Sequence, residues 1–533
     1  MAYLAYISRP WRVFHGGFMA EHILHTAGIR PAGYRALLDR FRLDVIPNWH
    51  QSCVATGNSH RVDTTAGVTV EVYPAKYWPG DSLGDHLEFA LKYDGTNLAI
   101  LASVFKEAPQ KEIQDYVASM PRGKYARRIW FLYEFLTGTI LPVENLQTGG
   151  YIDLLETDEY YTDTTPHPVR RQRINDNLLG DARFCPMIRR TDLLRTLEKA
   201  DISARCQKIV ANYPPQLLKR AMNYLYTKET KSSFEIEHIK PSSTRTERFI
   251  ALLHLAESED FCEEARLIDL QNRIVDTRFQ DTAYRTHQNY VGESVGWQRE
   301  KIHFAGPKPG ELNGLMEGLV AAHKRMEAGK VAAVVHAASV AYGFVFLHPF
   351  EDGNGRIHRF LIHNILARRG FTPAGIIFPV SAAMLKKFAD YDASLESFSR
   401  PLMALVEYSL DEKGQMTVQN DTTVWYRYID MTQQTEALLR FIEQTIDTEL
   451  VEELAFLSNY DQTKKALQEI VDMPDRKIDL FIQSCLQNNG RLSSRKRSSH
   501  FEFLSDSEIA RMEKEIRSAY DISKDPVKNS LGI

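Results

Sequence analysis

Apolar residues recur at helical spacing along most of the chain from residue 193 to about 408. The stretch 331–347 is apolar on nearly every face, which predicts a helix that is buried on all sides. Among these helical stretches, residues 296–306 alternate and are bounded by glycines, so a short β-hairpin is expected there. This part of the chain is therefore predicted to be mainly α. The other expected helices within it include 202–210, 247–255 and 312–326.

The regions before residue 191 have different patterns. Residues 1–140 are predicted to be a mixed α/β domain, because 68–73 alternates with β-branched residues, as strands do. Helical patterns follow at 85–92 and 127–136. Residues 141–190 are polar and contain several prolines, which is typical of a linker or of an extended arm packed on its neighbours.

The last region, 413–533, is predicted to be a helical domain. Pro474-Asp475 is expected to open one helix and Asn489-Gly490 to close it, and Ser505-x-x-Glu508 is a capping box for another. Four basic residues fall within 491–497, directly before a Phe-Glu-Phe segment. That combination leaves a winged helix as an alternative fold. The central domain is then placed at 191–412.

Length and composition narrow the class of protein. A chain of 533 residues is too long for one hydrophobic core. The net charge of −4 excludes a protein that coats nucleic acid along its whole length, although a local basic patch stays compatible with it. The five cysteines are scattered without metal-binding spacing, which favours the reducing cytoplasm. Neither a signal peptide nor a membrane-spanning stretch is recognisable, so no membrane contact is expected.

The segment LHPFEDGNGRIHR, residues 347–359, carries most of the candidate chemistry. Pro349 is expected to end the buried helix before it, because the residue preceding a proline disfavours helical geometry. Gly353-Asn354-Gly355 tolerates positive φ and lets the backbone approach a ligand closely. A second helix that begins there would present free N–H groups to phosphate oxygens.

The side chains of this segment suit phosphoryl or nucleotidyl transfer. Arg356 and Arg359 share a helix face, and guanidinium groups bind phosphate oxygens in pairs. Asp352 offers the oxygen ligand that Mg²⁺ prefers, and His348 could take a proton from an attacking hydroxyl. Each feature alone is common in structural turns, but their combination within twelve residues favours a catalytic site.

The segment resembles the signature of the Fic family, His-x-Phe-x-(Asp/Glu)-Gly-Asn-(Gly/Lys)-Arg-x-x-Arg, at every fixed position. The resemblance covers about residues 230–400. It implies a helical core with a β-hairpin flap at 296–306, and transfer of AMP from ATP to a Ser, Thr or Tyr hydroxyl of another protein or of the chain itself. Because a branch that transfers phosphate has Lys in place of Gly355, AMP transfer is the favoured reaction. The implied roles are general base for His348, Mg²⁺ ligand for Asp352, phosphate ligand for Asn354, anion hole for Gly353 and Gly355, and binding of the outer phosphates for Arg356 and Arg359.

Self-inhibited members of that family carry (Ser/Thr)-x-x-x-Glu-(Gly/Asn) on a helix, and Ser233-x-x-x-Glu237 matches its core within the expected inhibitory helix at 230–240. The resemblance implies that Glu237 binds Arg359 in place of the ATP γ-phosphate. His238 departs from the usual Gly or Asn, and Ser243-x-x-x-Glu247 fits the same core. The alternative is a helix whose glutamates lie in solvent.

Three functions are compatible with these features. The first is an adenylyltransferase inhibited by Glu237, and the second is an enzyme whose same site also removes AMP. The third is a catalytically idle nucleotide sensor that works through its terminal domains, which intact His348 and Asp352 argue against. The basic cluster predicts a contact with DNA or with a protein through residues 470–510.

Overall fold

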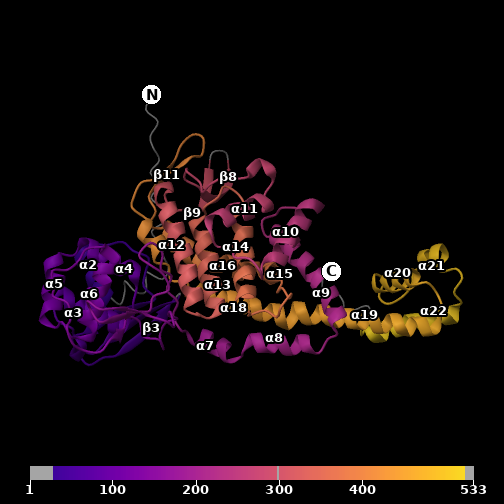
Figure 1. Ribbon diagram of the computed structural model, residues 1–533, viewed down its shortest axis with the longest axis horizontal. Helices are drawn as coiled ribbons and strands as arrows, with labels where there is room; N and C mark the ends of the chain where they lie inside the picture. Colours follow the sequence, from indigo (N-terminus) through magenta and orange to yellow (C-terminus); the bar gives the residue numbers. More distant parts are fainter. Residues whose placement is uncertain (1–27, 66, 297–298, 523–533) are drawn as a thin grey trace.

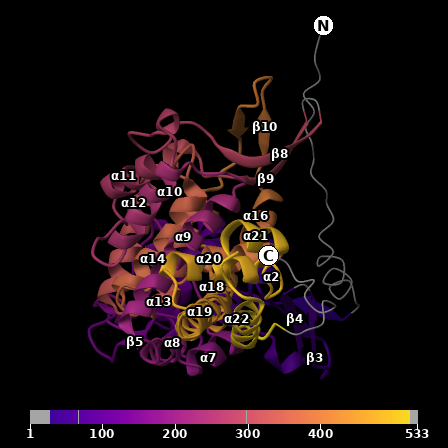
Figure 2. The ribbon, with the colours of Figure 1, turned by 90° about the vertical axis from the view of Figure 1, so that its right-hand side faces the viewer.

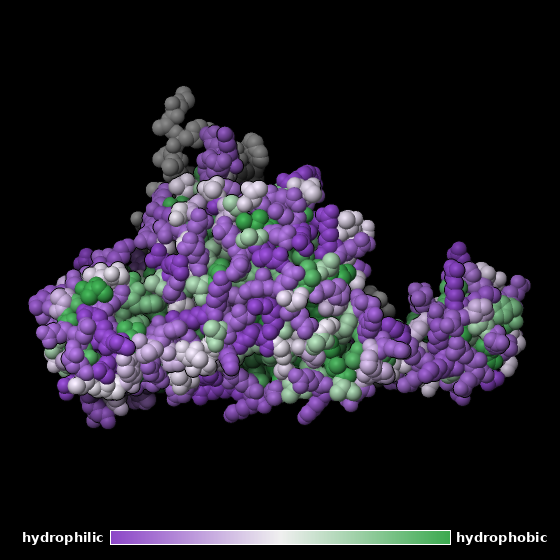
Figure 3. Space-filling model, viewed as in Figure 1, coloured by the Kyte–Doolittle hydropathy of each residue, from purple (hydrophilic) through white to green (hydrophobic). Residues whose placement is uncertain are grey.

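A computed structural model describes residues 28–65, 67–296 and 299–522 of the chain (Figure 1). It is mainly helical, as the sequence predicts, with four small sheets. An N-terminal α/β part lies at one end, the helical core in the middle, and a small helical module at the other end of a long helix (Figures 1 and 2). Hydrophilic side chains cover much of the face shown in Figure 3. None of the helices described combines the length and the apolar character needed to cross a membrane.

The N-terminal part is built on a four-stranded sheet of order β1-β2-β4-β3, in which β2 and β4 are parallel and the other pairs antiparallel. The predicted strand at 68–73 is confirmed as β4, and its inward side chains Val70 and Val72 are buried. The strands are β1 (Ile29–Pro31), β2 (His50–Ala55), β3 (Arg61–Thr65) and β4 (Val68–Tyr73). The helices are α2 (Gly33–Phe41), α3 (Leu83–Phe89), a π-helical turn (Ala90–Asp94), α4 (Leu98–Glu107), α5 (Gln110–Ser119) and α6 (Lys124–Thr137), with a 3₁₀ turn at Ala75–Tyr77.

Residues 141–190 form an extended arm held against the helical core. Within it, β5 (Ile152–Asp153), β6 (His167–Val169) and β7 (Ile174–Asp176) make a sheet of order β5-β7-β6. Arg325 of α12 pairs with Asp176 at 3.1 Å and with the buried carboxylate of Asp163 at 3.2 Å. These ion pairs tie the arm to the core that carries the site.

The helical core surrounds α13 (Ala333–Leu347), whose side chains are buried on nearly all faces, as its apolar sequence predicts. It packs along α14 (Asn354–Arg368). Around this pair lie α9 (Pro215–Glu235), α10 (Ser243–Leu255), α11 (Glu264–Ile274), α12 (Pro309–Ala328), α15 (Val380–Lys386), α16 (Phe388–Met403) and α18 (Thr432–Gln444). The shorter or peripheral elements are α7 (Asp192–Lys199), α8 (Ile202–Ala211), a 3₁₀ turn (Thr277–Phe279), β10 (Tyr408–Leu410), β11 (Met416–Val418) and α17 (Thr423–Arg427).

The hairpin predicted at 296–306 is present but begins earlier. Its strands are β8 (Tyr290–Gly296) and β9 (Arg299–Ala305), which pair antiparallel. The sequence did not predict the first strand. It contains two glycines and an irregular register between Val291 and Gly292, which interrupt the alternation of apolar and polar residues.

The C-terminal module is helical, and the wing considered at 491–503 is not formed. Residues 494–500 form helix α21 instead, because Ser493 caps it by accepting a hydrogen bond from the Lys496 N–H at 3.4 Å. The predicted capping box of Ser505 and Glu508 is confirmed at the start of α22. A π-helical turn (Thr445–Leu450) leads into the long helix α19 (Val451–Ile470), and α20 (Asp475–Leu486), α21 (Ser494–His500) and α22 (Asp506–Ala519) follow around a core of their own.

Candidate active site

The segment 347–359 forms a helix–loop–helix, as the sequence predicts. Helix α13 ends at Leu347, and His348 takes a left-handed conformation with φ of 48° that turns the chain. Gly353, with φ of 92°, then begins α14. Of the three residues Gly353-Asn354-Gly355, only Gly353 uses positive φ. The N-terminus of α14 thus faces the loop, where its free N–H groups are available to an anion.

The side chain of Asn354 holds this loop together. Its Nδ2 donates to the Phe350 carbonyl at 2.7 Å, and its Oδ1 accepts from the Phe350 N–H at 3.1 Å. Phe350 is itself fully buried. Both ends of the amide are therefore used inside the loop.

His348 presents a neutral ring. Its Nδ1 lies 3.1 Å from the Val345 carbonyl. Since a carbonyl only accepts, Nδ1 carries the hydrogen and Nε2 keeps its lone pair. Burial lowers the pKa of His348 to about 4. A neutral imidazole with a free Nε2 is the form that a general base needs.

Two residues that the sequence analysis did not single out hold His348 from outside the signature. The Nε of Arg285 donates to the His348 carbonyl at 2.9 Å, and the Nδ2 of Asn289 donates to the same oxygen at 3.0 Å. Both precede β8 in the chain. The sequence signal for both is the segment 284–291 that contains them, which resembles the stretch before the flap in the Fic family.

Glu237 joins the two arginines of the signature. Its Oε2 lies 2.7 Å from Nε of Arg356, and its Oε1 lies 2.8 Å from Nη2 of Arg359. Arg359 also donates to Ser233, to the hydroxyl at 2.9 Å and to the carbonyl at 2.6 Å. Although burial disfavours its charge, the Glu237 carboxylate raises the pKa of Arg359 above the ordinary value. Ser233 and Glu237 thus both reach Arg359.

Glu237 lies in the turn that ends α9, two residues beyond its last helical residue, and not within the helix as predicted. Ile239 N–H bonds to the Phe234 carbonyl at 3.0 Å, and His238 N–H bonds to that of Glu235 at 2.9 Å. This is the Schellman pattern, which needs a left-handed residue, and His238 supplies it with φ of 55°. His238 therefore takes the conformation for which Gly or Asn is usual.

The competing copy of the inhibitory pattern does not face the site. Ser243 and Glu247 both lie exposed on α10. In the first copy, Glu235 is exposed, and only Ser233 and Glu237 turn inward.

Gly355 makes room for the inhibitory carboxylate. A Cβ added at this position would lie 2.5 Å from Oε1 of Glu237 and 3.2 Å from Nη1 of Arg359. Any side chain here would push Glu237 away from the helix N-terminus. The glycine thus permits the same close approach by Glu237 that a phosphate would require.

Asp352 offers one carboxylate oxygen to a cation. Its Oδ1 accepts from the Gly353 N–H at 2.6 Å and from Arg356 at 2.5 Å. Its backbone carbonyl is held by Gln271 at 3.3 Å. The half-exposed side chain leaves Oδ2 for a ligand, which suits a magnesium ion shared with phosphates.

The structure contains a second group of potential metal ligands, Asp260, His323 and Glu327. The negative charge of its two carboxylates is already balanced by an arginine of the protein. Their ligand atoms lie within 4.8 Å of one another. Arg368 contacts Asp260 at 3.3 Å and Glu327 at 2.8 Å. Asp352 is therefore the better candidate for a metal.

Comparison with known proteins agrees with this geometry. The profile of the Fic/DOC family matches residues 261–366. A "Protein adenylyltransferase Fic" of Drosophila mojavensis is 23% identical over 269 residues, which are 45% of this chain and 50% of that protein. The protein of the same name from Aedes aegypti is 27% identical over 164 residues, 30% of either chain. The chain thus spans half or less of these curated relatives.

Among solved structures, a Fic family protein from Desulfovibrio desulfuricans G20 aligns with 63% of this chain and 85% of its own, at 17% identity and a TM-score of 0.36. That score is too low to bear on the fold. The family assignment rests instead on the matched segment, which includes α13, the loop and most of α14. The chain therefore contains a Fic domain, at residues 261–366.

Proposed function

We propose that the chain is a protein adenylyltransferase, which moves AMP from ATP to a Ser, Thr or Tyr hydroxyl of a protein, and that Glu237 holds it inhibited. The carboxylate of Glu237 between Arg356 and Arg359 is the observation that carries this proposal. An anion of the protein fills the place where the family signature puts the outer phosphates. The names of the relatives, each a protein adenylyltransferase, support the same reaction.

In the proposed reaction, the hydroxyl oxygen attacks the α-phosphorus of ATP. A new P–O bond forms as the bond between the α-phosphorus and the bridging oxygen breaks, and pyrophosphate leaves. The hydroxyl proton passes to Nε2 of His348, whose carbonyl is fixed by Arg285 and Asn289. The N-terminal N–H groups of α14 would stabilise charge on the phosphate oxygens.

Asp352 would hold a magnesium ion through its free oxygen. When bound, the ion would neutralise part of the phosphate charge. Asp352 also holds Arg356, so that one carboxylate would align both a metal and a phosphate-binding guanidinium. Asn354 would act on the reaction through the loop backbone that it fixes.

Inhibition follows from competition for the same arginines. While Glu237 occupies Arg356 and Arg359, the γ-phosphate lacks its partners and ATP binds misaligned. A displacement of about an ångström at the reacting phosphorus can cost ~10²-fold in rate. The buried Ser233 hydroxyl, which accepts from Arg359, would keep that guanidinium in place after Glu237 withdraws.

Incubation of the protein with ATP labelled in its α-phosphate tests the proposal, alone and with a cell lysate. Covalent label on protein, increased by Glu237→Gly and lost in His348→Ala, supports an inhibited adenylyltransferase. Loss of label removal in Glu237→Gly would favour the enzyme that also removes AMP. Nucleotide binding without any transfer in either form would favour the idle sensor.

We also propose that the C-terminal module contacts the phosphate backbone of nucleic acid through α21 and the residues directly before it. Arg491, Arg495 and Arg497 are exposed, and Lys496 lies between the last two. Of these, Arg497 is paired with Asp506. Three basic side chains are thus left for a partner, and an acidic protein surface is the alternative.

The five free, buried thiols of the described residues support a reducing compartment, the cytoplasm.

A further inference from the structure

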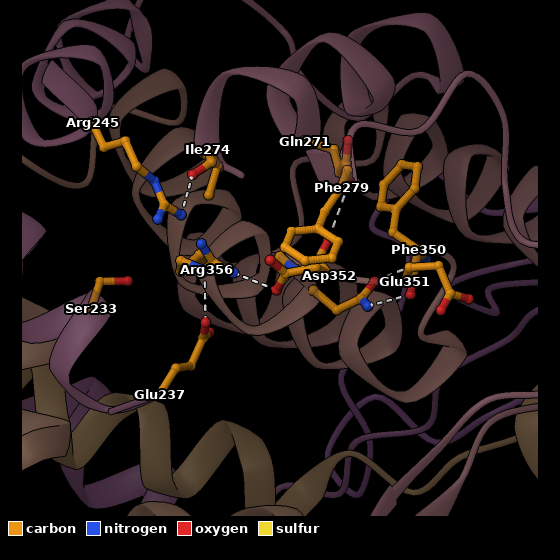
Figure 4. Close-up of polar contacts among 12 residues, drawn as sticks. Ser233, Glu237, Arg245, Gln271, Ile274, Phe279, Phe350, Glu351, Asp352 and Arg356 are labelled. Atoms are coloured by element: carbon orange, nitrogen blue, oxygen red, sulfur yellow. Dashed lines mark hydrogen bonds and ion pairs between the residues drawn. The ribbon is translucent and has the colours of Figure 1, made fainter. Parts of the chain in front are cut away.

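A third arginine, outside the matched segment, lies beside the candidate phosphate site. The guanidinium carbon of Arg245, on α10, is 5.2 Å from the centre of the Phe234 ring. The same carbon of Arg356 is 5.3 Å from that ring centre. Figure 4 shows the Arg245 side chain directed toward Arg356. Phe234 is fully buried next to Ser233, so its ring is a fixed contact for both cations.

Arg245 is held in place without being neutralised. Its Nη2 donates to the carbonyl of Ile274, the last residue of α11, at 3.1 Å. Its Nε is buried and has no hydrogen-bond partner in the part of the chain that the structure describes. Its fixed partner is thus an uncharged carbonyl at a helix C-terminus, which orients the guanidinium and leaves its charge free.

The local charges leave a positive excess. Arg356 contacts two carboxylates, Glu237 at 2.7 Å and Asp352 at 2.5 Å, and Arg359 shares Glu237. Burial and the neighbouring charge of Arg356 lower the pKa of Arg245. Asp276 also acts on Arg245 but is paired with Arg278 at 2.9 Å. Three carboxylates thus face four guanidinium groups, and like charges held together favour binding of a further anion.

We propose that Arg245 binds the terminal phosphate of the nucleotide and makes the site prefer a triphosphate to a diphosphate. This inference rests on the proposed function and adds a residue to it. A terminal phosphate has three acceptor oxygens, whereas the Glu237 carboxylate has two, both engaged with arginines. A phosphate in place of that carboxylate would therefore have an oxygen left for Arg245. A diphosphate would leave this contact unmade.

Binding of ATP and of ADP, each with magnesium, is measured by calorimetry. The parent carries His348→Ala and Glu237→Gly, so that transfer cannot occur and the arginines are free. Adding Arg245→Gln is expected to weaken ATP binding by about 10-fold and ADP binding by less than about twofold, since one charge-assisted contact is lost. The matched control is Arg248→Gln, an exposed arginine on the same helix, which is expected to change neither.

A third variant, Arg245→Lys, keeps the charge but loses the planar fork, and is expected to fall between the parent and Arg245→Gln. If Arg245→Gln does not fold, Arg245→Lys takes its place in the binding measurement. An unchanged ratio of ATP to ADP affinity in both Arg245 variants would overturn the assignment while leaving the proposed function standing. A parent that binds neither nucleotide would overturn the proposed function and this assignment with it.

Discussion

Oε1 of Glu237, in the turn that follows α9, lies 2.8 Å from Nη2 of Arg359 on α14, and a contact between α9 itself and α14 lies deeper in the core. There, the buried carboxylate of Glu229 on α9 accepts from Nε2 of His363 on α14 at 2.8 Å. Glu229 precedes Glu237, whereas His363 follows Arg359, so the two segments run in opposite directions. Helix α9 is thus docked independently of its terminal carboxylate. Release of Glu237 requires a movement of the turn at 236–238, and α9 can stay in place.

Glu237→Gly is therefore expected to raise AMP transfer by ~10²-fold without unfolding the protein, because the γ-phosphate regains its arginines. Intact mass of the self-modified protein, at matched ATP and magnesium, measures the gain. The control is Glu235→Gly, which removes an exposed carboxylate from the same helix end and is expected to have no effect. Arg359→Ala added to Glu237→Gly should remove the gain, since both act through one contact. Modification unchanged or lowered by Glu237→Gly contradicts the inhibitory role.

His348→Ala, in the Glu237→Gly background, is expected to lower transfer by ~10²–10⁴-fold and to leave ATP binding nearly unchanged. The base is lost, but the arginines and the α14 N-terminus are not touched. Single-turnover rates at saturating ATP and calorimetric ATP affinity separate the two effects. A variant that transfers AMP at the parent rate would show that another group takes the proton.

The pH dependence of transfer should lack the step of an ordinary histidine. Burial lowers the pKa of His348 to about 4, so the ring stays neutral, and able to accept a proton, down to that pH. Activity should then fall only as pH drops through about 4. Between pH 7.5 and 5.5 the rate is expected to change by less than about twofold, whereas a base with the ordinary pKa would lose about tenfold. Single-turnover rates of Glu237→Gly across this pH range distinguish a base with the lowered pKa from one with the ordinary pKa.

The sequence predicted best what is local. The segment from His348 to Arg359 could be interpreted because its parts lie within twelve residues, and Arg356 and Arg359 share one helix face through their spacing. The turn at Glu237 was harder to predict from the sequence. His238 fills the left-handed position, so the Gly that usually signals a helix end is missing. Arg245 gave no signal, because its place beside Arg356 depends on how α10 packs against α9 and α11. Contacts between distant segments have no periodicity that a single sequence reveals.

The basic helix of the C-terminal module can be tested with substitutions in the whole chain. Removal of everything after residue 411 would take away α18, whose Leu438 is buried against the core, so truncation would disturb the Fic domain. Replacing Arg491, Arg495 and Lys496 together by Gln is expected to weaken retention on DNA and to reduce the slope of log K against log salt by about 2–3. Transfer of AMP should not change.

The matched control for that test replaces Arg511 and Lys514 by Gln, two exposed basic residues of α22 in the same module. It removes positive charge but leaves α21 intact, so retention should stay near that of the parent. An equal loss of retention on DNA in both variants would indicate a general effect of positive charge rather than a contact made by α21. If the parent is not retained on DNA even at low salt, the acidic protein partner becomes the better explanation for α21.

His238→Gly should strengthen the inhibited state. His238 has φ of 55°, which costs a residue with a Cβ about 1–2 kcal/mol and costs glycine little. Its side chain is exposed, so little packing is lost with it. Glycine also gains freedom in the unfolded chain, worth about 0.5–1 kcal/mol, so a net stabilisation of roughly 0.5 kcal/mol is expected. Because this turn places Glu237 on Arg356 and Arg359, basal AMP transfer should fall while the melting temperature rises slightly.

The same substitution combined with Glu237→Gly should keep the stability gain and lose the effect on transfer, since no carboxylate is left to position. A lower melting temperature for His238→Gly would mean that the histidine side chain supports the turn in a way that outweighs its backbone strain.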